Sequence, residues 1–117
     1  MRDFEITSTI ERMDFKKLIK DTIVVKNKFK TSLGKQGRML DLMEEVGELA
    51  NAMLMVDGGK TSGNPAKQRT MADIADALAD CLYDLIILAD DYNIDLDKEY
   101  SGMLQKMKNR FRSGDLK

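Results

Sequence analysis

The sequence predicts an all-α protein, a four-helix antiparallel bundle. Apolar residues recur at three- and four-residue spacing in four separate stretches, as they do along one face of a helix. Aromatic residues make up only 6% of the chain and nine residues are methionine, a composition that favours helices over sheets. At 117 residues the chain has the length of one domain. We therefore expect residues 1–13 to form an N-terminal arm or a short helix, and residues 14–117 to form a single helical domain.

The first helix is expected to run from Asp14, which can act as its N-cap, to about Lys30. Its apolar positions are Phe15, Leu18, Ile19, Ile23 and Phe29. This helix and the turn after it are the basic part of the molecule, with lysine at positions 16, 17, 20, 26, 28, 30 and 35. Two interpretations of these lysines are open: a solvated helix face, or side chains that reach phosphate.

The second helix is expected from about Gln36 to Val56, after a break at residues 31–34. Its apolar face is formed by Met39, Leu42, Met43, Val46, Ala50 and Met53, with Leu49 at the edge. Gly47 inside this helix is about 1 kcal/mol less favourable than alanine, which indicates close backbone packing or the approach of a ligand. Residues 57–65 form a turn-rich loop that joins two helices and lacks the Walker-A spacing of glycine and lysine.

The third helix is expected from about Lys67 to Tyr92, with Asn93 as a left-handed C-cap. Its apolar side is formed by Ile74, Leu78, Cys81, Leu82, Leu85, Ile86, Leu88 and Ala89. The single cysteine, Cys81, cannot form a disulfide within the chain. We interpret it as a buried small hydrophobic residue in a reducing cytoplasm.

The fourth helix is expected from about Leu96 to Phe111, capped by Asp95 or Asp97. Its buried stripe is expected to be Tyr100, Met103, Leu104, Met107 and Phe111. Basic residues gather near its C-terminal end, where they complement the negative pole of the helix dipole.

Composition excludes several classes of function. The chain has no histidine, so it has no Ser-His-Asp triad, no Glu-x-x-His di-iron site and no histidine zinc site. A net charge of -1 argues against a general nucleic-acid-binding protein. No apolar run approaches the roughly 18 residues that span a bilayer, and the N-terminus lacks an apolar signal core. We expect a cytoplasmic protein with no nucleic-acid or membrane partner.

Two helical stretches carry acidic stripes without any basic residue. The first stripe is Asp41, Glu44, Glu45 and Glu48, and the second is Asp73, Asp76, Asp80 and Asp84. Each set recurs at three- or four-residue spacing and therefore lies on one helix face. The windows 39–59 and 70–97 hold thirteen of the twenty carboxylates and none of the nineteen basic residues.

These stripes allow two interpretations. Each lies opposite the apolar stripe of its own helix, so both could be solvated outer faces. Surface helices normally mix both signs of charge, however, and neither of these does. If the stripes face each other, six or more carboxylates share one pocket and need a cation to stay ionised. Mg²⁺ and Mn²⁺ prefer such oxygen ligands and leave coordination positions for substrate phosphate.

The residues Glu44-Glu45-x-x-Glu48 in the run EEVGELA, the acidic helix that ends LADDYNIDL and the basic segment KMKNR resemble the MazG-like, all-α nucleoside triphosphate pyrophosphohydrolases. The similarity spans about residues 36–112. The family pattern is E-E-x-x-E followed by E-x-x-D on a later helix, and these acids bind Mg²⁺. Asp80 matches the closing aspartate.

One position departs from the family pattern. The family's second-motif glutamate falls on Ala77, which cannot bind a metal ion. Asp76 is adjacent and Asp73 lies one turn earlier on nearly the same face as Asp80, so either could substitute. Alternatively, Asp73-x-x-Asp76 itself serves as the second motif after a shift of one helical turn.

The resemblance implies hydrolysis of a nucleoside triphosphate to the monophosphate and pyrophosphate, with Mg²⁺ or Mn²⁺ as cofactor, in the upkeep of the nucleotide pool. It implies metal ligands among Glu45, Glu48, Asp73, Asp76 and Asp80, and a homodimer or homotetramer. Glu44 or Glu45 is the candidate to orient or deprotonate water. Candidates for holding phosphate are Lys35, Arg38, Lys106 and Arg110.

A second class of function fits the same stripes. A non-enzymatic helical interaction module could use an acidic, divalent-ion-binding face to bind a basic partner. Hydrolysis of nucleotides that requires Mg²⁺ or Mn²⁺ distinguishes the enzyme from such a module.

Overall fold

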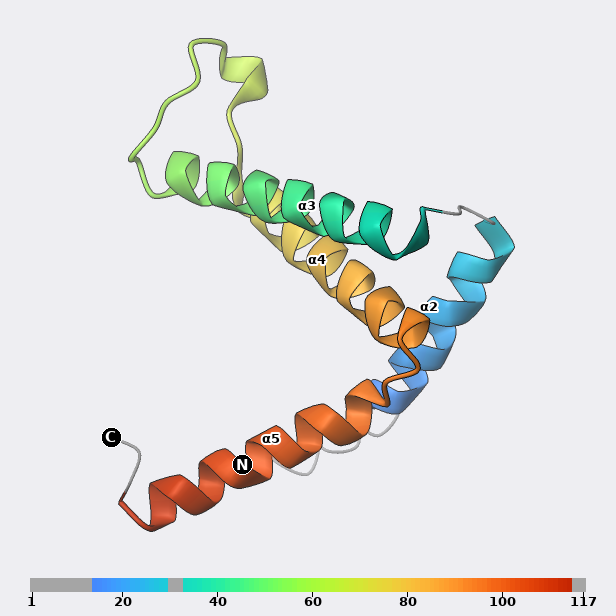
Figure 1. The fold of residues 1–117 in the computed structure, drawn as a ribbon. Coiled ribbons are helices and arrows are strands. Elements are labelled where there is room, and N and C mark those ends of the chain that lie inside the picture. Colours follow the sequence, from blue (N-terminus) through green and yellow to red (C-terminus); the bar gives the residue numbers. More distant parts are fainter. Residues whose placement is uncertain (1–13, 30–32, 115–117) are drawn as a thin grey trace. The chain divides into compact units, whose positions relative to one another are not determined.

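The computed structural model describes residues 14–29 and 33–114, and within these ranges it contains helices and no strand. The elements are α2 (Phe15–Phe29), α3 (Gly34–Val56), the short 3₁₀ helix η1 (Pro65–Lys67), α4 (Met71–Asp91) and α5 (Leu96–Arg112), shown in Figure 1. The predicted all-α class is confirmed. The arm predicted for residues 1–13 lies outside the described residues.

The chain divides into two compact units. Of the described residues, 14–29 and 89–114 belong to one unit, and 33–88 belong to the other, which we call the 31–88 unit. The second unit holds α3, η1 and most of α4, and it contains all the residues that carry the acidic stripes.

Within the 31–88 unit, α3 and α4 form an antiparallel helix pair joined by the loop that contains η1 (Figure 1). Arg38 near the start of α3 contacts Asp84 late in α4, and Glu48 lies close to Arg69, just before α4 begins. The buried apolar side chains of this unit are Leu42, Ala52, Ala77, Ile86 and Ile87. Two of these five are alanines, and small side chains allow two helices to approach closely.

The start of α4 differs from the prediction, which placed it at about Lys67. Residues 65–67 form the separate η1 turn, and α4 begins at Met71. The backbone N–H of Thr70 donates to the Asp73 carboxylate at 2.7 Å, which is the reciprocal bond of a capping box with Thr70 as N-cap. This cap fixes the helix start four residues after the expected position.

The end of α4 follows the prediction. Asn93 has a φ of 57°, and the N–H groups of Asn93 and Ile94 donate to the carbonyls of Asp90 and Ala89. These two bonds form a Schellman motif, for which asparagine in the left-handed region is a suitable residue. Asp95 then caps α5 by accepting from the backbone N–H of Lys98 at 3.1 Å.

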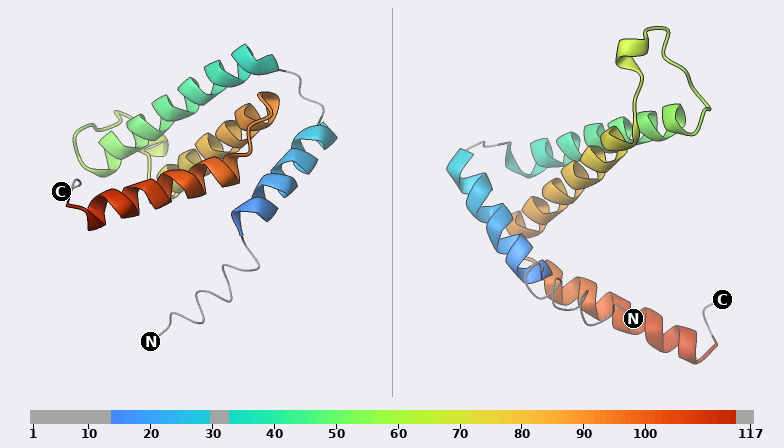
Figure 2. Two further views of the ribbon diagram at one scale, coloured as in Figure 1. Left: turned by 60° about the horizontal axis from the view of Figure 1, so that its bottom comes forward. Right: turned by 180° about the vertical axis from the view of Figure 1, so that it is seen from behind.

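In the other unit, α2 contacts α5 at their N-terminal ends (Figure 2). The rings of Phe15 and Tyr100 meet edge to face, with centroids 6.1 Å apart. Lys26 forms an ion pair with Asp91 at 3.3 Å. Asp14 caps α2 as predicted, because its carboxylate accepts from the backbone N–H of Lys17 at 2.7 Å.

The apolar stripes are more exposed than predicted. Tyr100, Met103, Leu104, Met107 and Phe111 were expected to be buried, but each is at least 40% exposed in the single chain. Met39, Met43, Val46, Met53, Leu78, Leu82 and Leu85 of α3 and α4 are exposed as well. A single copy does not cover these side chains among the residues that the structure describes, and the homo-oligomer remains a prediction.

Gly47 and the apolarity of the helices can also be compared with the sequence-based predictions. A side chain at Gly47 would meet no atom within 4 Å, so the predicted close packing at this glycine is wrong for the described residues. None of the described helices combines the length and the apolarity that crossing a membrane requires.

Candidate functional site

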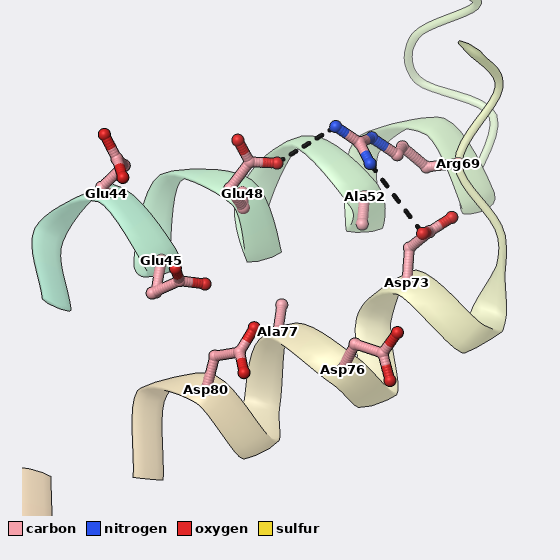
Figure 3. Close-up of a pocket in the computed structure, with 9 residues that line it drawn as sticks. All are labelled: Glu44, Glu45, Glu48, Ala52, Arg69, Asp73, Asp76, Ala77 and Asp80. Atoms are coloured by element: carbon pink, nitrogen blue, oxygen red, sulfur yellow. Dashed lines mark hydrogen bonds and ion pairs between the residues drawn. The ribbon is translucent and has the colours of Figure 1, made fainter. Parts of the chain in front are cut away.

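A pocket of about 300 Å³ lies between α3 and α4, and six carboxylates line it (Figure 3). The lining residues are Glu44, Glu45 and Glu48 from α3, Asp73, Asp76 and Asp80 from α4, together with Ala52, Ala77 and Arg69. The two acidic stripes therefore face each other. This arrangement favours facing stripes over two separate outer faces.

The α3 side of the site is a compact group of acids within one and a half helical turns. Carboxylate oxygens of Asp41, Glu44 and Glu45 lie within 4.8 Å of one another, a spacing that could hold a metal ion. Glu48 follows one turn later and points toward the other end of the pocket (Figure 3). Residues three and four apart share one helix face, so the local helix alone produces this cluster.

Glu45 meets acids on both helices. Its pKa is raised above the ordinary value, first because burial disfavours the charged form, and then because the carboxylates of Asp80 and Asp41 are close. Asp80 lies on the opposite helix, so this repulsion acts across the helix pair. A proton or a cation between the two carboxyl groups would relieve it.

The α4 side presents three aspartates around one alanine. Ala77 is only 5% exposed, and its methyl group points to α3 between the carboxylates (Figure 3). One carboxylate oxygen of Asp73 is already engaged, because Oδ2 accepts hydrogen bonds from both the backbone N–H and the hydroxyl of Thr70. Asp76 makes no hydrogen bond or ion pair within the described part of the chain, and its carboxylate is exposed. Asp76 is therefore the α4 acid most available to a cation near Ala77.

Arg69 supplies the single positive charge among the residues that line the pocket. Its Nη2 lies 3.1 Å from Glu48 Oε2, and its Nη1 lies 3.8 Å from Asp73 Oδ1. Sequence reasoning missed Arg69, because it lies in the irregular segment before α4, just outside the acidic windows. Recognising the capping box Thr70-x-x-Asp73 would have placed Arg69 directly before the helix and beside the second stripe.

Arg38 and Asp84 form a buried ion pair beside the pocket. Arg38 Nη1 lies 2.9 Å from Asp84 Oδ1, and the two side chains are only 6% and 1% exposed. The guanidinium also lies over the ring of Tyr83, 5.8 Å from its centroid. Arg38, a candidate for phosphate binding, is thus engaged inside the helix pair.

The second oxygen of Asp84 has no donor in the described structure. Burial and the nearby carboxyl group of Asp41 raise the pKa of Asp84, Arg38 opposes the rise, and the net value is about 6. A proton held between Asp84 and Asp41 would satisfy the orphan oxygen. Asp84 therefore favours protonation more than an ordinary aspartate does.

Cys81 was expected to be a buried small hydrophobic residue, but it is partly exposed. Its pKa is raised by burial and by the negative charges of Glu45, Asp84 and Asp80. Raising the pKa of a thiol lowers the fraction of reactive thiolate at neutral pH. Cys81 is therefore a poor nucleophile here.

The remaining predicted phosphate ligands do not line the pocket. Lys35 lies exposed in the first turn of α3. Lys106 and Arg110 lie on the exposed surface of α5, which belongs to the other compact unit.

The donor set of the pocket fits a hard divalent cation, because its ligating groups are carboxylates and it has neither histidine nor thiolate in the lining. Fold and site together define an all-α protein with a carboxylate pocket between two antiparallel helices. The family model of the MazG nucleotide pyrophosphohydrolase domain matches residues 34–113. The chain belongs to this family. Comparisons with curated proteins and with solved structures gave no match.

The raised pKa of Asp84 predicts a specific dependence of stability on pH. The pKa is about 6 in the folded chain against an ordinary value of 3.8, so the folded state binds this proton more tightly than the unfolded state. The stabilisation is fully present below pH 4 and is lost as the pH rises through about 6. The free energy of unfolding of the wild type, relative to Asp84→Asn, should fall by on the order of 1–3 kcal/mol between pH 4 and 7.

Urea unfolding of both proteins across this pH range measures the difference. Asp90→Asn, an exposed position on the same helix, serves as the matched control and should follow the wild type. Parallel stability curves for the wild type and Asp84→Asn would contradict the assignment.

Proposed function

We propose that this protein hydrolyses a nucleoside triphosphate to the monophosphate and pyrophosphate, with Mg²⁺ or Mn²⁺ bound between α3 and α4. The observation that supports this best is the convergence of six carboxylates on one pocket with a single guanidinium among them. Membership of the MazG nucleotide pyrophosphohydrolase family supports the reaction class. The natural role of such an enzyme would be the upkeep of the nucleotide pool.

The ligands we assign to the cation are Glu45 and Glu48 from α3 and Asp80 from α4. The further ligand expected at Ala77 would come from Asp76, whose carboxylate has no polar partner within the described residues, or from Asp73, once its contact with Arg69 is released. The cation supplies charge neutralisation for the phosphate oxygens of the substrate.

Glu44 and Glu45 are the proposed catalytic carboxylates. Water attacks one of the two phosphorus atoms of the α–β bridge while a carboxylate accepts its proton, the bond from that phosphorus to the bridging oxygen breaks, and the monophosphate and pyrophosphate are released. Glu45 is the candidate general base, because burial and the neighbouring acids raise its pKa, and a carboxylate with a raised pKa accepts a proton more readily near neutral pH. Glu44 is exposed and lies beside it in the same cluster, where it can orient the water.

The basic residues divide into two groups. Arg38 is held by Asp84 and packs against Tyr83, so we assign it to the stability of the helix pair in place of phosphate binding. Lys35, Lys106 and Arg110 remain proposed phosphate ligands on the strength of their charge and exposure.

Hydrolysis should require both the cation and Glu48. A panel of nucleoside triphosphates, assayed for pyrophosphate release, should show turnover with Mg²⁺ or Mn²⁺ and none with chelator. Glu48→Gln should abolish turnover while the folded fraction is unchanged, because it removes one negative charge and keeps the side-chain shape.

Glu99→Gln is the matched control, because Glu99 is exposed in the first turn of α5 and does not line the pocket. Normal turnover by Glu48→Gln would contradict the assigned site. Inactivity of the wild type towards every nucleotide, together with metal-free binding of a basic peptide, would favour the interaction module.

The departure at Ala77 yields a separate prediction. If Asp76 has taken over as ligand, Asp80→Asn and Asp76→Asn should each lower activity by orders of magnitude. Ala77→Glu should then be neutral or harmful, because another carboxylate already holds the cation and the new side chain adds a charge to an acidic lining. Steady-state kinetics at saturating Mg²⁺ and at saturating Mn²⁺ measure these effects.

Ala79→Glu and Asp90→Asn are matched controls on exposed positions of the same helix. A strong gain of activity in Ala77→Glu, with no loss in Asp76→Asn or Asp73→Asn, would show instead that the chain lacks a ligand that was never replaced.

A further inference from the structure

Arg69 is placed by its backbone at the mouth of the carboxylate pocket. Its backbone N–H donates to the sulfur of Met55 at 3.3 Å, and the neighbouring Gln68 side chain bonds both the backbone N–H of Ser62 and the carbonyl of Met55. These contacts hold the segment before α4 against the end of α3. The long side chain of Arg69 then extends from a fixed base to the acids (Figure 3).

The ion pairs that Arg69 forms with Glu48 and Asp73 are weak enough for another ligand to replace them. The side chains of Arg69, Glu48 and Asp73 are 39%, 50% and 35% exposed, and ion pairs that open to water contribute little stability. By contrast, the Arg38–Asp84 pair is almost fully buried and is costly to break. Of the two arginines beside the stripes, Arg69 is therefore the one that can leave its partner.

The partner that Arg69 would leave is a proposed metal ligand. Its Nη2 lies 3.1 Å from Glu48 Oε2, so a cation that binds the same carboxylate competes with this contact for the negative charge. Once displaced, the guanidinium remains tethered at the pocket by its backbone. Its planar fork suits the bidentate recognition of phosphate oxygens, which a triphosphate bound at the cation would present.

We propose that Arg69 is an exchangeable counter-ion: it neutralises Glu48 and Asp73 when no metal is bound, and it moves to the phosphate chain of the nucleotide when a divalent cation takes Glu48. This inference rests on the proposed function for the identity of the phosphate ligand. The residue binds substrate, and its competition with the cation couples metal binding to nucleotide binding.

Arg69→Met tests both the competition with the cation and the binding of phosphate, because methionine fills similar space without charge. Titration of the nucleotide-free variant with Mn²⁺ should show affinity about two- to fivefold tighter than the wild type, since a competing ion pair is gone. At saturating Mn²⁺, affinity for a non-hydrolysable nucleoside triphosphate analogue should fall about 10- to 100-fold, because a charge-assisted contact is lost. Calorimetry measures both affinities without turnover.

Lys67→Met is the matched control: Lys67 is an exposed cation two residues earlier that does not line the pocket, and its loss should change neither affinity. Arg69→Lys should keep the Mn²⁺ affinity of the wild type and recover part of the analogue affinity. A purely structural ion pair would give weaker Mn²⁺ binding in Arg69→Met, and that result would overturn the proposal.

Unchanged affinity for the analogue in Arg69→Met would also overturn it. Failure of the proposed function has a different signature, in which the wild type hydrolyses no nucleoside triphosphate in the panel while the Mn²⁺ affinities still separate the two proteins.

Discussion

Repulsion between facing carboxylates is the constraint on which the site depends. α3 and α4 each present a stripe of acids, and the fold turns both stripes toward one pocket instead of toward opposite solvent faces. Among the lining residues one guanidinium opposes six carboxylates. Glu45 shows the result directly, because Asp80 and Asp41 raise its pKa in addition to the effect of burial. Protons or cations in this pocket would relieve the repulsion.

The rest of the 31–88 unit holds this unfavourable arrangement in place. At one end of the helix pair, the buried Arg38–Asp84 contact ties α3 to α4. At the other end, the segment around Gln68 is bonded to the end of α3 and leads into the cap of α4. Between these ends the helices meet through small side chains such as Ala52 and Ala77, which leave room for the pocket. The polar contacts at both ends thus fix the distance between the acids.

The inward-facing acids also explain the exposure of the apolar stripes. Each acidic stripe lies opposite the apolar stripe of its own helix, so turning the acids inward leaves residues such as Met43 and Leu78 outside. These side chains are 60% and 55% exposed in the single chain. This is the physical reason that the stripe pattern predicted the helices of this pair correctly but predicted too much burial: Leu42, Ile86 and Ala89 are buried as predicted, whereas most of the other apolar positions are not.

Much of the fold and the site follows from local sequence. The spacing of apolar residues predicted the four helices. The caps at Asp14, Asn93 and Asp95 could be predicted because each cap bonds to, or shapes the backbone of, residues only a few positions away. The facing stripes could be inferred because two uncompensated rows of like charge need a common counter-charge. Long-range pairs could not be inferred: Arg38 meets a partner 46 residues away. Arg69 was missed because its position depends on where α4 starts, which a single capping box decides.

Binding of a divalent cation to the folded chain at these carboxylates is tested most directly by thermal unfolding of the wild type with Mn²⁺ against chelator. A ligand that binds only the native state stabilises it by about 3 kcal/mol at one hundred times its dissociation constant. The melting temperature should therefore climb with Mn²⁺ concentration, well beyond the effect of potassium chloride at equal ionic strength, which only screens the repulsion. Melting curves that coincide in Mn²⁺, potassium chloride and chelator would contradict a cation site between α3 and α4.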